Sequence, residues 1–151
     1  MSDSFTKLHY HLIFATKYRL PLIQPGIRSE LERFLAASVA KMGGHAIEIG
    51  GMPDHTHILA GLPPTISIAD ALKRLKGSSS HWLSRRPDID FFAWQLGYGA
   101  FTVSASMIDR VRRYIQNQEK HHAKYSLTEE IQLLRERHGL NAFDDDEGEA
   151  S

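Results

Sequence analysis

Two histidines separated by one residue are the first feature of this chain that could carry chemistry. His55 and His57 lie in the segment 55–62, whose residues favour a β-strand. Side chains two apart on a strand point to the same face, so both rings can reach one metal ion, and imidazole binds several divalent metals. The spacing alone is weak evidence, because His9 and His11 repeat it in another expected strand and such pairs more often have a structural role.

A tyrosine and a glutamine one helical turn apart are the second feature. At about 100° per residue, Ile108, Val111 and Ile115 form the buried stripe of a helix, and Tyr114 and Gln118 lie at the edge of that stripe. The tyrosine can equally be a residue at the rim of the core with its hydroxyl in water, and the glutamine a surface amide. The helix pattern therefore leaves their role open.

Charge is distributed unevenly along the chain. There are 18 acidic and 18 basic residues, a net charge of zero that by itself disfavours a nucleic-acid partner. Residues 144–151 contain five of the acids, so the rest of the chain has 13 acids against 18 bases, a net charge of +5. Two basic stretches can then contact a polyanion, or be solvated helix surface. The stretches are Lys73, Arg74 and Lys76 with Arg85 and Arg86, and Arg110, Arg112 and Arg113 with Lys120 and Lys124.

Several classes of protein are excluded by composition. The chain has no cysteine, which excludes disulfides, thiolate metal sites and a cysteine nucleophile. It has no apolar run near the ~18 residues that a membrane span needs, and its first residues lack the pattern of a secretory signal. The length of 151 residues predicts a single domain, 1–143, followed by a disordered acidic tail, 144–151.

The elements that must position these residues follow from periodicity and turn signals. Ser67 with Asp70, Ser106 with Asp109, and Ser126 with Glu129 have the spacing of helix N-terminal caps. The order strand, helix, two strands, helix, two strands and two helices predicts an α/β sandwich, with a mainly antiparallel sheet of about five strands covered by helices. The expected strands are 5–16, 45–49, 55–62, 91–96 and 98–103, and the expected helices are 27–42, 67–86, 106–124 and 126–138.

Taken in order, these motifs resemble those of the HUH single-tyrosine transposases of the smallest bacterial insertion sequences. Pro53-Asp54-His55-x-His57-Ile58-Leu59 resembles the metal motif of that family, and Tyr114-x-x-x-Gln118-Glu119-Lys120-His121-His122 resembles its nucleophile helix. The segments 11–19, 72–80 and 94–104 are similar to its first strand and exit, its basic helix and the hairpin before the nucleophile helix. The resemblance covers roughly residues 5–140. Thr56 departs from it, because the family has a bulky apolar residue there.

The resemblance implies a ferredoxin-like, RRM-like HUH fold and a definite chemistry. His55, His57 and Gln118 would bind a divalent ion, Mg²⁺ or Mn²⁺, and Tyr114 would attack single-stranded DNA to give a 5′-phosphotyrosine and a free 3′-hydroxyl. A ligand set without carboxylates would leave the full charge of the cation facing the DNA. The general base is not identified, and His122 is expected to lie too far along the helix from Tyr114.

Partners are also implied by the resemblance. We expect DNA hairpins at element ends as substrate, phosphate contacts from the two basic stretches, and a homodimer in the bacterial cytoplasm at the nucleoid. Whether Tyr114 serves its own chain or the neighbouring one is left open. The alternatives are a domesticated relative that acts on repeated palindromes, a hairpin-binding regulator without catalysis, and a small α/β domain with an incidental histidine pair.

Overall fold

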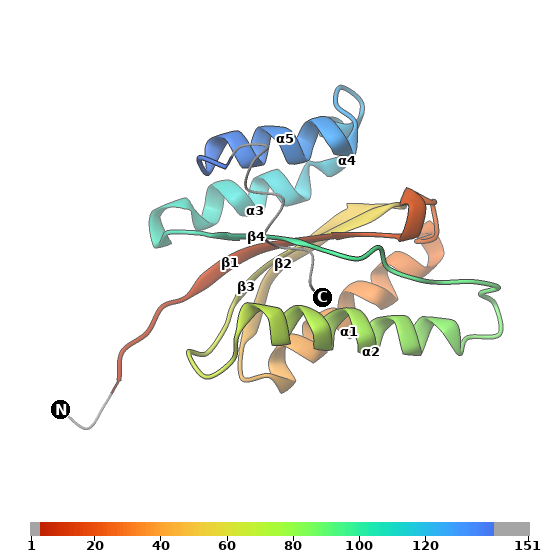
Figure 1. Ribbon diagram of the computed structural model, residues 1–151, viewed down its shortest axis with the longest axis horizontal. Coiled ribbons are helices and arrows are strands. Elements are labelled where there is room, and N and C mark those ends of the chain that lie inside the picture. The colour runs from red at the N-terminus through yellow and green to blue at the C-terminus, as the bar shows by residue number, and fades with distance from the viewer. Residues whose placement is uncertain (1–3, 141–151) are drawn as a thin grey trace.

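The computed structural model of the protein describes residues 4–140. Its elements lie in three layers, with a sheet between two layers of helices (Figure 1). In chain order they are β1 (His9–Ala15), η1 (Lys17–Arg19), α1 (Pro25–Lys41), β2 (His45–Met52), β3 (His55–Gly61), α2 (Ile68–Ser84), β4 (Gly99–Thr102), η2 (Ala105–Met107), α3 (Ile108–Gln116), α4 (Gln118–His122) and α5 (Leu127–Arg137).

The sheet has four antiparallel strands in the order β2-β3-β1-β4. Every residue of β3 is buried, because β3 is paired on both edges and covered on both faces. The register places Ala15 opposite His55 and Ile13 opposite His57. Each strand alternates between the two faces, so β1 and β3 together determine which side chains can meet above the sheet.

Helices α1 and α2 cover one face of the sheet, and α3, α4 and α5 lie over the other (Figure 1). The larger core lies under α1 and α2, where Leu12, Phe14 and Ile58 are at most 2% exposed. Two smaller apolar clusters lie on the opposite face. One joins Leu59, Val103 and Ile115, and the other joins Ile13, Phe101 and Leu134. The face with the smaller cores therefore has room for polar side chains.

The fold class is confirmed, but the fifth strand is not present. Residues 91–96 form no named strand and make a single bridge, from Trp94 to Thr16. The pairing stops there because β1 ends at Ala15 and the chain turns into η1 at Lys17; the Phe92 and Trp94 rings pack edge to face, and Trp94 also packs against Phe14. Gly97, with φ +87, then turns the chain into β4. Phe92 is buried, whereas Phe91 and Leu96 are 53% and 80% exposed.

Two other details differ from the prediction. The expected helix 106–124 is divided at Asn117, where φ is −100° and ψ is 23°. Its predicted cap from Ser106 to Asp109 is absent, because a 3-10 turn precedes α3 and the Ser104 and Ser106 hydroxyls contact each other at 3.2 Å. The caps at Ser67 and Ser126 are confirmed, the second as a full capping box.

Element ends shift by a few residues. Strand β2 continues to Met52, so the turn into β3 is only two residues long and Asp54 stands directly before His55. Pro25, expected in a loop, is the first residue of α1, where its missing N–H has no consequence. Within residues 4–140, none of the helices is long and apolar enough to cross a membrane. The predicted acidic tail lies outside the described residues.

Candidate active site

The two histidines of β3 are fully buried on the face of the sheet that α3, α4 and α5 cover. His55 and His57 are both 0% exposed. Their ring centroids are 5.0 Å apart, as expected for residues two apart on a strand. Thr56, between them, points to the other face and does not interrupt the pair. The predicted geometry of the histidine pair is therefore present.

Each histidine is oriented through its second nitrogen. Nδ1 of His55 contacts Oδ1 of Asp54 at 2.7 Å. Because a carboxylate only accepts hydrogen bonds, Nδ1 carries the proton and the lone pair of Nε2 faces the site. Nδ1 of His57 contacts Nε2 of His11 at 2.8 Å. Such contacts fix the rings of metal-binding histidines.

His9 and His11, the second pair with the same spacing, have separate surroundings. His11 supports His57 and its ring lies 5.9 Å from that of Tyr114. His9 instead lies beside His45, with ring centroids 6.0 Å apart. Only His11 borders the site, so the two H-x-H pairs are distinguished by what packs against them.

The nucleophile candidate and the glutamine both point into this site. The ring of Tyr114 lies 5.8 Å from that of His57 in the same chain. Oε1 of Gln118 lies 3.0 Å from Nε2 of His55, and Gln118 is 2% exposed. The break at Asn117 separates the two residues into different helices, yet both keep the orientation predicted for one continuous helix.

A carboxylate from α5 lies at the centre of the cluster, and sequence reasoning missed it. Glu130 is 3% exposed. Its Oε1 accepts hydrogen bonds from the Tyr114 hydroxyl and, at 3.0 Å, from Nε2 of Gln118. The same oxygen lies 3.0 Å from Nε2 of His57. The expectation of a site without carboxylates is therefore wrong for this arrangement.

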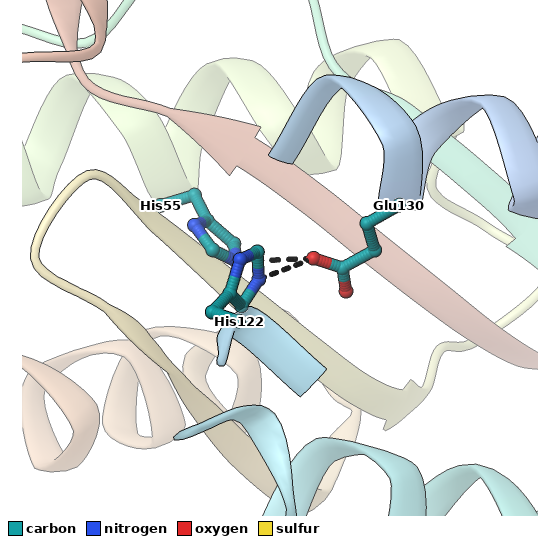
Figure 2. A group of neighbouring side chains, drawn as sticks. All are labelled: His55, His122 and Glu130. Atoms are coloured by element: carbon teal, nitrogen blue, oxygen red, sulfur yellow. Dashed lines mark ion pairs between the residues drawn. The ribbon is translucent and has the colours of Figure 1, made fainter. Parts of the chain in front are cut away.

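The second oxygen of Glu130 faces two other imidazoles. Oε2 lies 2.5 Å from Nε2 of His122 and 3.6 Å from Nε2 of His55. Figure 2 shows these side chains converging from α5, α4 and β3. His122 was expected to lie too far along the helix to serve as the base for Tyr114; in the structure it contacts Glu130 and lies beside His55 instead.

The sequence does contain a signal for Glu130. Leu127, Glu130 and Leu134 are the buried residues of α5, at positions i, i+3 and i+7. A charged residue on an otherwise apolar stripe is rarely buried without a partner. The partners cannot be read from the sequence, because they come from β3, α3 and α4.

Burial and mutual contact shift the pKa values of this cluster. Burial, then the contact with Glu130, raises the pKa of Tyr114 well above its ordinary value. Burial alone would raise the pKa of Glu130, but the contacts with His57, Tyr114 and Gln118 hold that pKa well below its usual range. Burial lowers the pKa of His57, and burial together with His57 lowers the pKa of His11 to about 3. Glu130 is thus charged, while His57 and His11 are neutral near pH 7.

These residues fit a divalent metal ion. Nε2 of His57, Nε2 of His122 and Oε2 of Glu130 are buried and have no hydrogen bond of proper geometry, which is costly unless another partner is supplied. The ligand atoms of His55, His122 and Glu130 lie within 4.8 Å of one another. These three residues can hold a metal ion, with His57 and Gln118 adjoining them through Glu130.

The predicted DNA-contacting residues are divided between the two faces. Lys73 and Arg74 are exposed on α2, whereas Arg110, Arg112 and Arg113 are exposed on α3. Arg112 also lies 3.5 Å from Glu48.

Lys76 has a different place from its neighbours on α2. Its Nζ donates to the backbone oxygens of Gln95 and Gly97 at 2.7 and 2.8 Å, so its charge holds a loop. Of the aromatic side chains in or near this region of the chain, Phe92 is 4% exposed, and Trp82 stacks on Phe34. Trp94 packs on Phe14 and Phe92, and Tyr98 is 40% exposed.

Known proteins with similar sequences support the family resemblance that the motifs indicated. Residues 4–118 match the family model described as IS200-like transposase. The ISDra2 transposase TnpA of Deinococcus radiodurans is 30% identical over 122 residues, 74% of this chain and 84% of that protein. The transposase for insertion sequence element IS200 of Salmonella typhimurium is 29% identical over 115 residues, 72% of this chain and 75% of that protein.

Two solved structures share the fold. A transposase from Deinococcus radiodurans R1 has a TM-score of 0.60 and 31% identity over 78% of this chain and 98% of that one. A REP-associated tyrosine transposase bound to a REP hairpin has a TM-score of 0.59 over 81% of this chain and 74% of that one, with 13% identity. The match over residues 4–118 includes the histidine pair, Tyr114 and Gln118, but ends before Glu130. The resemblance seen in the motifs is confirmed, and this chain belongs to the family of IS200-like transposases.

Proposed function

We propose that this transposase cleaves and rejoins single-stranded DNA at hairpin-marked element ends, with Tyr114 as nucleophile and a divalent metal ion in the adjoining site. One observation carries the proposal. The Tyr114 hydroxyl, the Gln118 amide and the two imidazoles of β3 all converge on the Glu130 carboxylate in a buried cluster. This set combines a nucleophile, a base and metal ligands, which is what transesterification of a phosphodiester requires.

The reaction begins with the phenol of Tyr114. Its oxygen attacks the scissile phosphorus, the bond from phosphorus to the 3′-oxygen breaks, and a 5′-phosphotyrosine and a 3′-hydroxyl form. The phenolic proton passes to Oε1 of Glu130, which already accepts the hydrogen bond of that hydroxyl, and the leaving 3′-oxygen takes up a proton from water. In the joining step a DNA 3′-hydroxyl attacks the phosphotyrosine and Tyr114 recovers its proton. One phosphodiester replaces another, so no nucleotide cofactor is needed.

The raised pKa of Tyr114 explains why a cation belongs in this mechanism. A buried neutral phenol is a poor nucleophile. A divalent ion in the site would polarise the scissile phosphate and stabilise the charge that develops there. The mixed nitrogen and oxygen donors are suited to Mn²⁺, and Mg²⁺ is the alternative with its preference for oxygen ligands.

The substrate is inferred from charge and relatives. The structural neighbour bound to a REP hairpin supports hairpin DNA as the partner class. Lys73 and Arg74 on α2, with Arg110, Arg112 and Arg113 on α3, are exposed and can contact phosphates without reading sequence. The same neighbour favours the second candidate, a domesticated transposase acting on repeated palindromes. Element ends with hairpins beside the gene would exclude that candidate.

A covalent adduct tests the proposed function. The protein is incubated with single-stranded hairpin oligonucleotides from its genomic flanks and Mn²⁺ or Mg²⁺, and then run on a denaturing gel. We expect a shifted band that is absent in Tyr114→Phe and without metal. A protein that binds these hairpins but forms no adduct would be the non-catalytic regulator instead.

A further inference from the structure

Just after β1, the chain makes an unusual exposed turn. Tyr18 has φ 55 and ψ 17, and Arg19 has φ 53. Two consecutive non-glycine residues with positive φ are rare and energetically unfavourable. Tyr18 is also 77% exposed. A large aromatic side chain is thus presented to solvent by a backbone conformation that it does not favour.

The surroundings of the turn hold it in this conformation. Thr16 is 0% exposed, its backbone N–H donates to the Asp54 carbonyl at 2.9 Å, and its hydroxyl donates to the Leu20 carbonyl at 2.6 Å. The N–H of Lys17 donates to the Ala93 carbonyl at 2.9 Å. The residues just before the turn are therefore fixed to the β2–β3 turn and to the segment before β4, and Leu20 after it is bonded back to Thr16, while the exposed Tyr18 ring contributes little to the core.

The turn also adjoins the candidate active site. Ala15 pairs with His55, and the Asp54 residue that holds Thr16 also holds the imidazole of His55. On the other side, the Arg19 guanidinium donates to the hydroxyl of Thr128, two residues before Glu130 on α5. Figure 1 shows η1 at the end of the sheet that lies below the start of α5.

The side chains on the turn match the chemistry of single-stranded DNA. The exposed Tyr18 stands between two exposed cations, and Nζ of Lys17 lies 5.5 Å from its ring centroid. An aromatic ring flanked by cations binds unpaired nucleotides, because the ring stacks on the base while the cations neutralise neighbouring phosphates. A stacked base needs no particular sequence, since each base has a π face.

We propose that Lys17, Tyr18 and Arg19 form a nucleotide-binding subsite, in which Tyr18 stacks on an unpaired base next to the scissile phosphate. The inference rests on the proposed function for the position of the DNA. The stacked base would hold the strand at the end of the sheet, with its backbone directed to the cluster around His55. Phe92 is less suited to this purpose, because it is buried in the core, and Trp94 is partly buried against that core, with its ring packed on Phe14 and Phe92.

The test compares binding to an oligonucleotide that carries bases with binding to one that lacks them. Binding of the full chain to an oligothymidylate and to an abasic oligonucleotide of equal length is measured by fluorescence anisotropy. The variant is Tyr18→Asn, because asparagine accepts positive φ and lacks the ring. We expect oligothymidylate binding to weaken by about fivefold or more, from the value of stacking one base, and abasic binding to stay unchanged. Tyr18→Phe should bind like the parent chain.

A control variant distinguishes base stacking at Tyr18 from a general effect of losing an exposed aromatic ring. Phe5→Ala removes another such ring, 81% exposed, at the opposite end of β1, and should change neither affinity. If Tyr18→Asn weakens binding to both oligonucleotides equally, or to neither, the proposal is overturned. A large drop in the Tm of Tyr18→Asn would also overturn it, because the ring would then serve folding. The Tyr114 adduct is scored separately. If no adduct forms but the base-dependent loss is found, the subsite stands and the proposed transesterification fails.

Discussion

At the level of single residues, the site is organised around Glu130 rather than around the histidine pair. The two oxygens of its carboxylate have different neighbours. Oε1 faces Tyr114, Gln118 and His57, whereas Oε2 faces His55 and His122. One oxygen can therefore accept the proton of the nucleophile while the other is available to a cation. We therefore propose that Glu130 has two roles, which a single substitution would remove together.

Replacing the carboxylate by its amide tests both roles. Glu130→Gln keeps the size of the side chain but removes its charge, so we expect Mn²⁺ affinity, followed by electron paramagnetic resonance, to fall by about tenfold or more. Adduct formation should fall as well, even at saturating Mn²⁺, because the base is lost. Glu129→Gln, on the exposed side of the same helix, is the matched control. Unchanged Mn²⁺ affinity would remove Glu130 from the ligand set.

The neutral imidazole of His11 predicts a dependence of stability on pH. Burial, then the charge of His57, lowers the pKa of His11 in the folded chain to about 3 from an ordinary value of 6.5. Between these values the unfolded chain binds more protons, so the free energy of unfolding decreases as pH falls through this range. The lowered pKa of Glu130 acts in the same direction at still lower pH.

Urea unfolding without metal at pH 7.5 and pH 5.5 measures this effect. We expect the parent chain to lose stability at the lower pH, and His11→Asn to lose less. His81→Asn changes an exposed histidine on α2 and should behave as the parent chain does. A parent chain of equal stability at both pH values would contradict the assignment of a neutral buried His11.

At the level of elements, the short helices on the second face assemble the site. Because the helix is divided at Asn117, Gln118 starts α4 and His122 ends it against β3 and α5. Helix α5 then brings Glu130 back over the sheet, held by Leu134 in a small cluster with Ile13 and Phe101. The position of the carboxylate therefore depends on a modest apolar contact between α5 and the sheet.

Removing an apolar contact that holds α5 on the sheet should weaken metal binding without changing any candidate metal ligand. Leu134 is 6% exposed, so Leu134→Ala leaves a cavity and costs about 2–4 kcal/mol of stability. We expect Mn²⁺ affinity to fall and backbone amides of α5 to exchange faster with deuterium. Leu133→Ala, at 38% exposed on the same helix, should have little effect on either. If both variants bind Mn²⁺ equally well, α5 does not contribute to the metal site.

At the level of the whole molecule, one chain brings the predicted nucleophile and the histidine pair together. Tyr114 lies beside His57 of its own chain and its hydroxyl bonds to Glu130 of that chain. This contact favours a site built within one chain over one shared by the two subunits of the expected homodimer. The two basic stretches are on opposite faces of the sheet, so a hairpin bound at α2 and a strand bound at α3 would approach the molecule from different sides.

Mixing two variants with different defects distinguishes a site within one chain from a site shared by two subunits. His57→Ala and Tyr114→Phe are combined, allowed to exchange subunits, and assayed for the covalent adduct. From the arrangement within one chain we expect no recovery, because each chain keeps its own defect. Recovery to a substantial fraction of parent activity would show that Tyr114 serves the metal site of a neighbouring subunit.

The sequence by itself was enough for the family and for the sandwich of a mainly antiparallel sheet and helices. It also singled out His55, His57, Tyr114 and Gln118, which lie together in the structure. These depend on local periodicity: alternation in a strand places two histidines together, and one helical turn aligns a tyrosine with a glutamine. Two of three predicted caps were right for the same local reason. The strand expected at 91–96 was wrong, because β1 ends at Ala15 and turns into η1, which leaves this segment only one bridge, to Thr16.

Only the tertiary structure decided what surrounds those four residues. Glu130, His122 and His11 come from three different elements, and their meeting depends on the break at Asn117, the docking of α5 and the register of β1 on β3. Sequence spacing carries no information on such long-range contacts, because each is the result of packing between whole elements. The same packing fixes the turn that exposes Tyr18 beside the site, a feature that the local pattern of the sequence does not reveal.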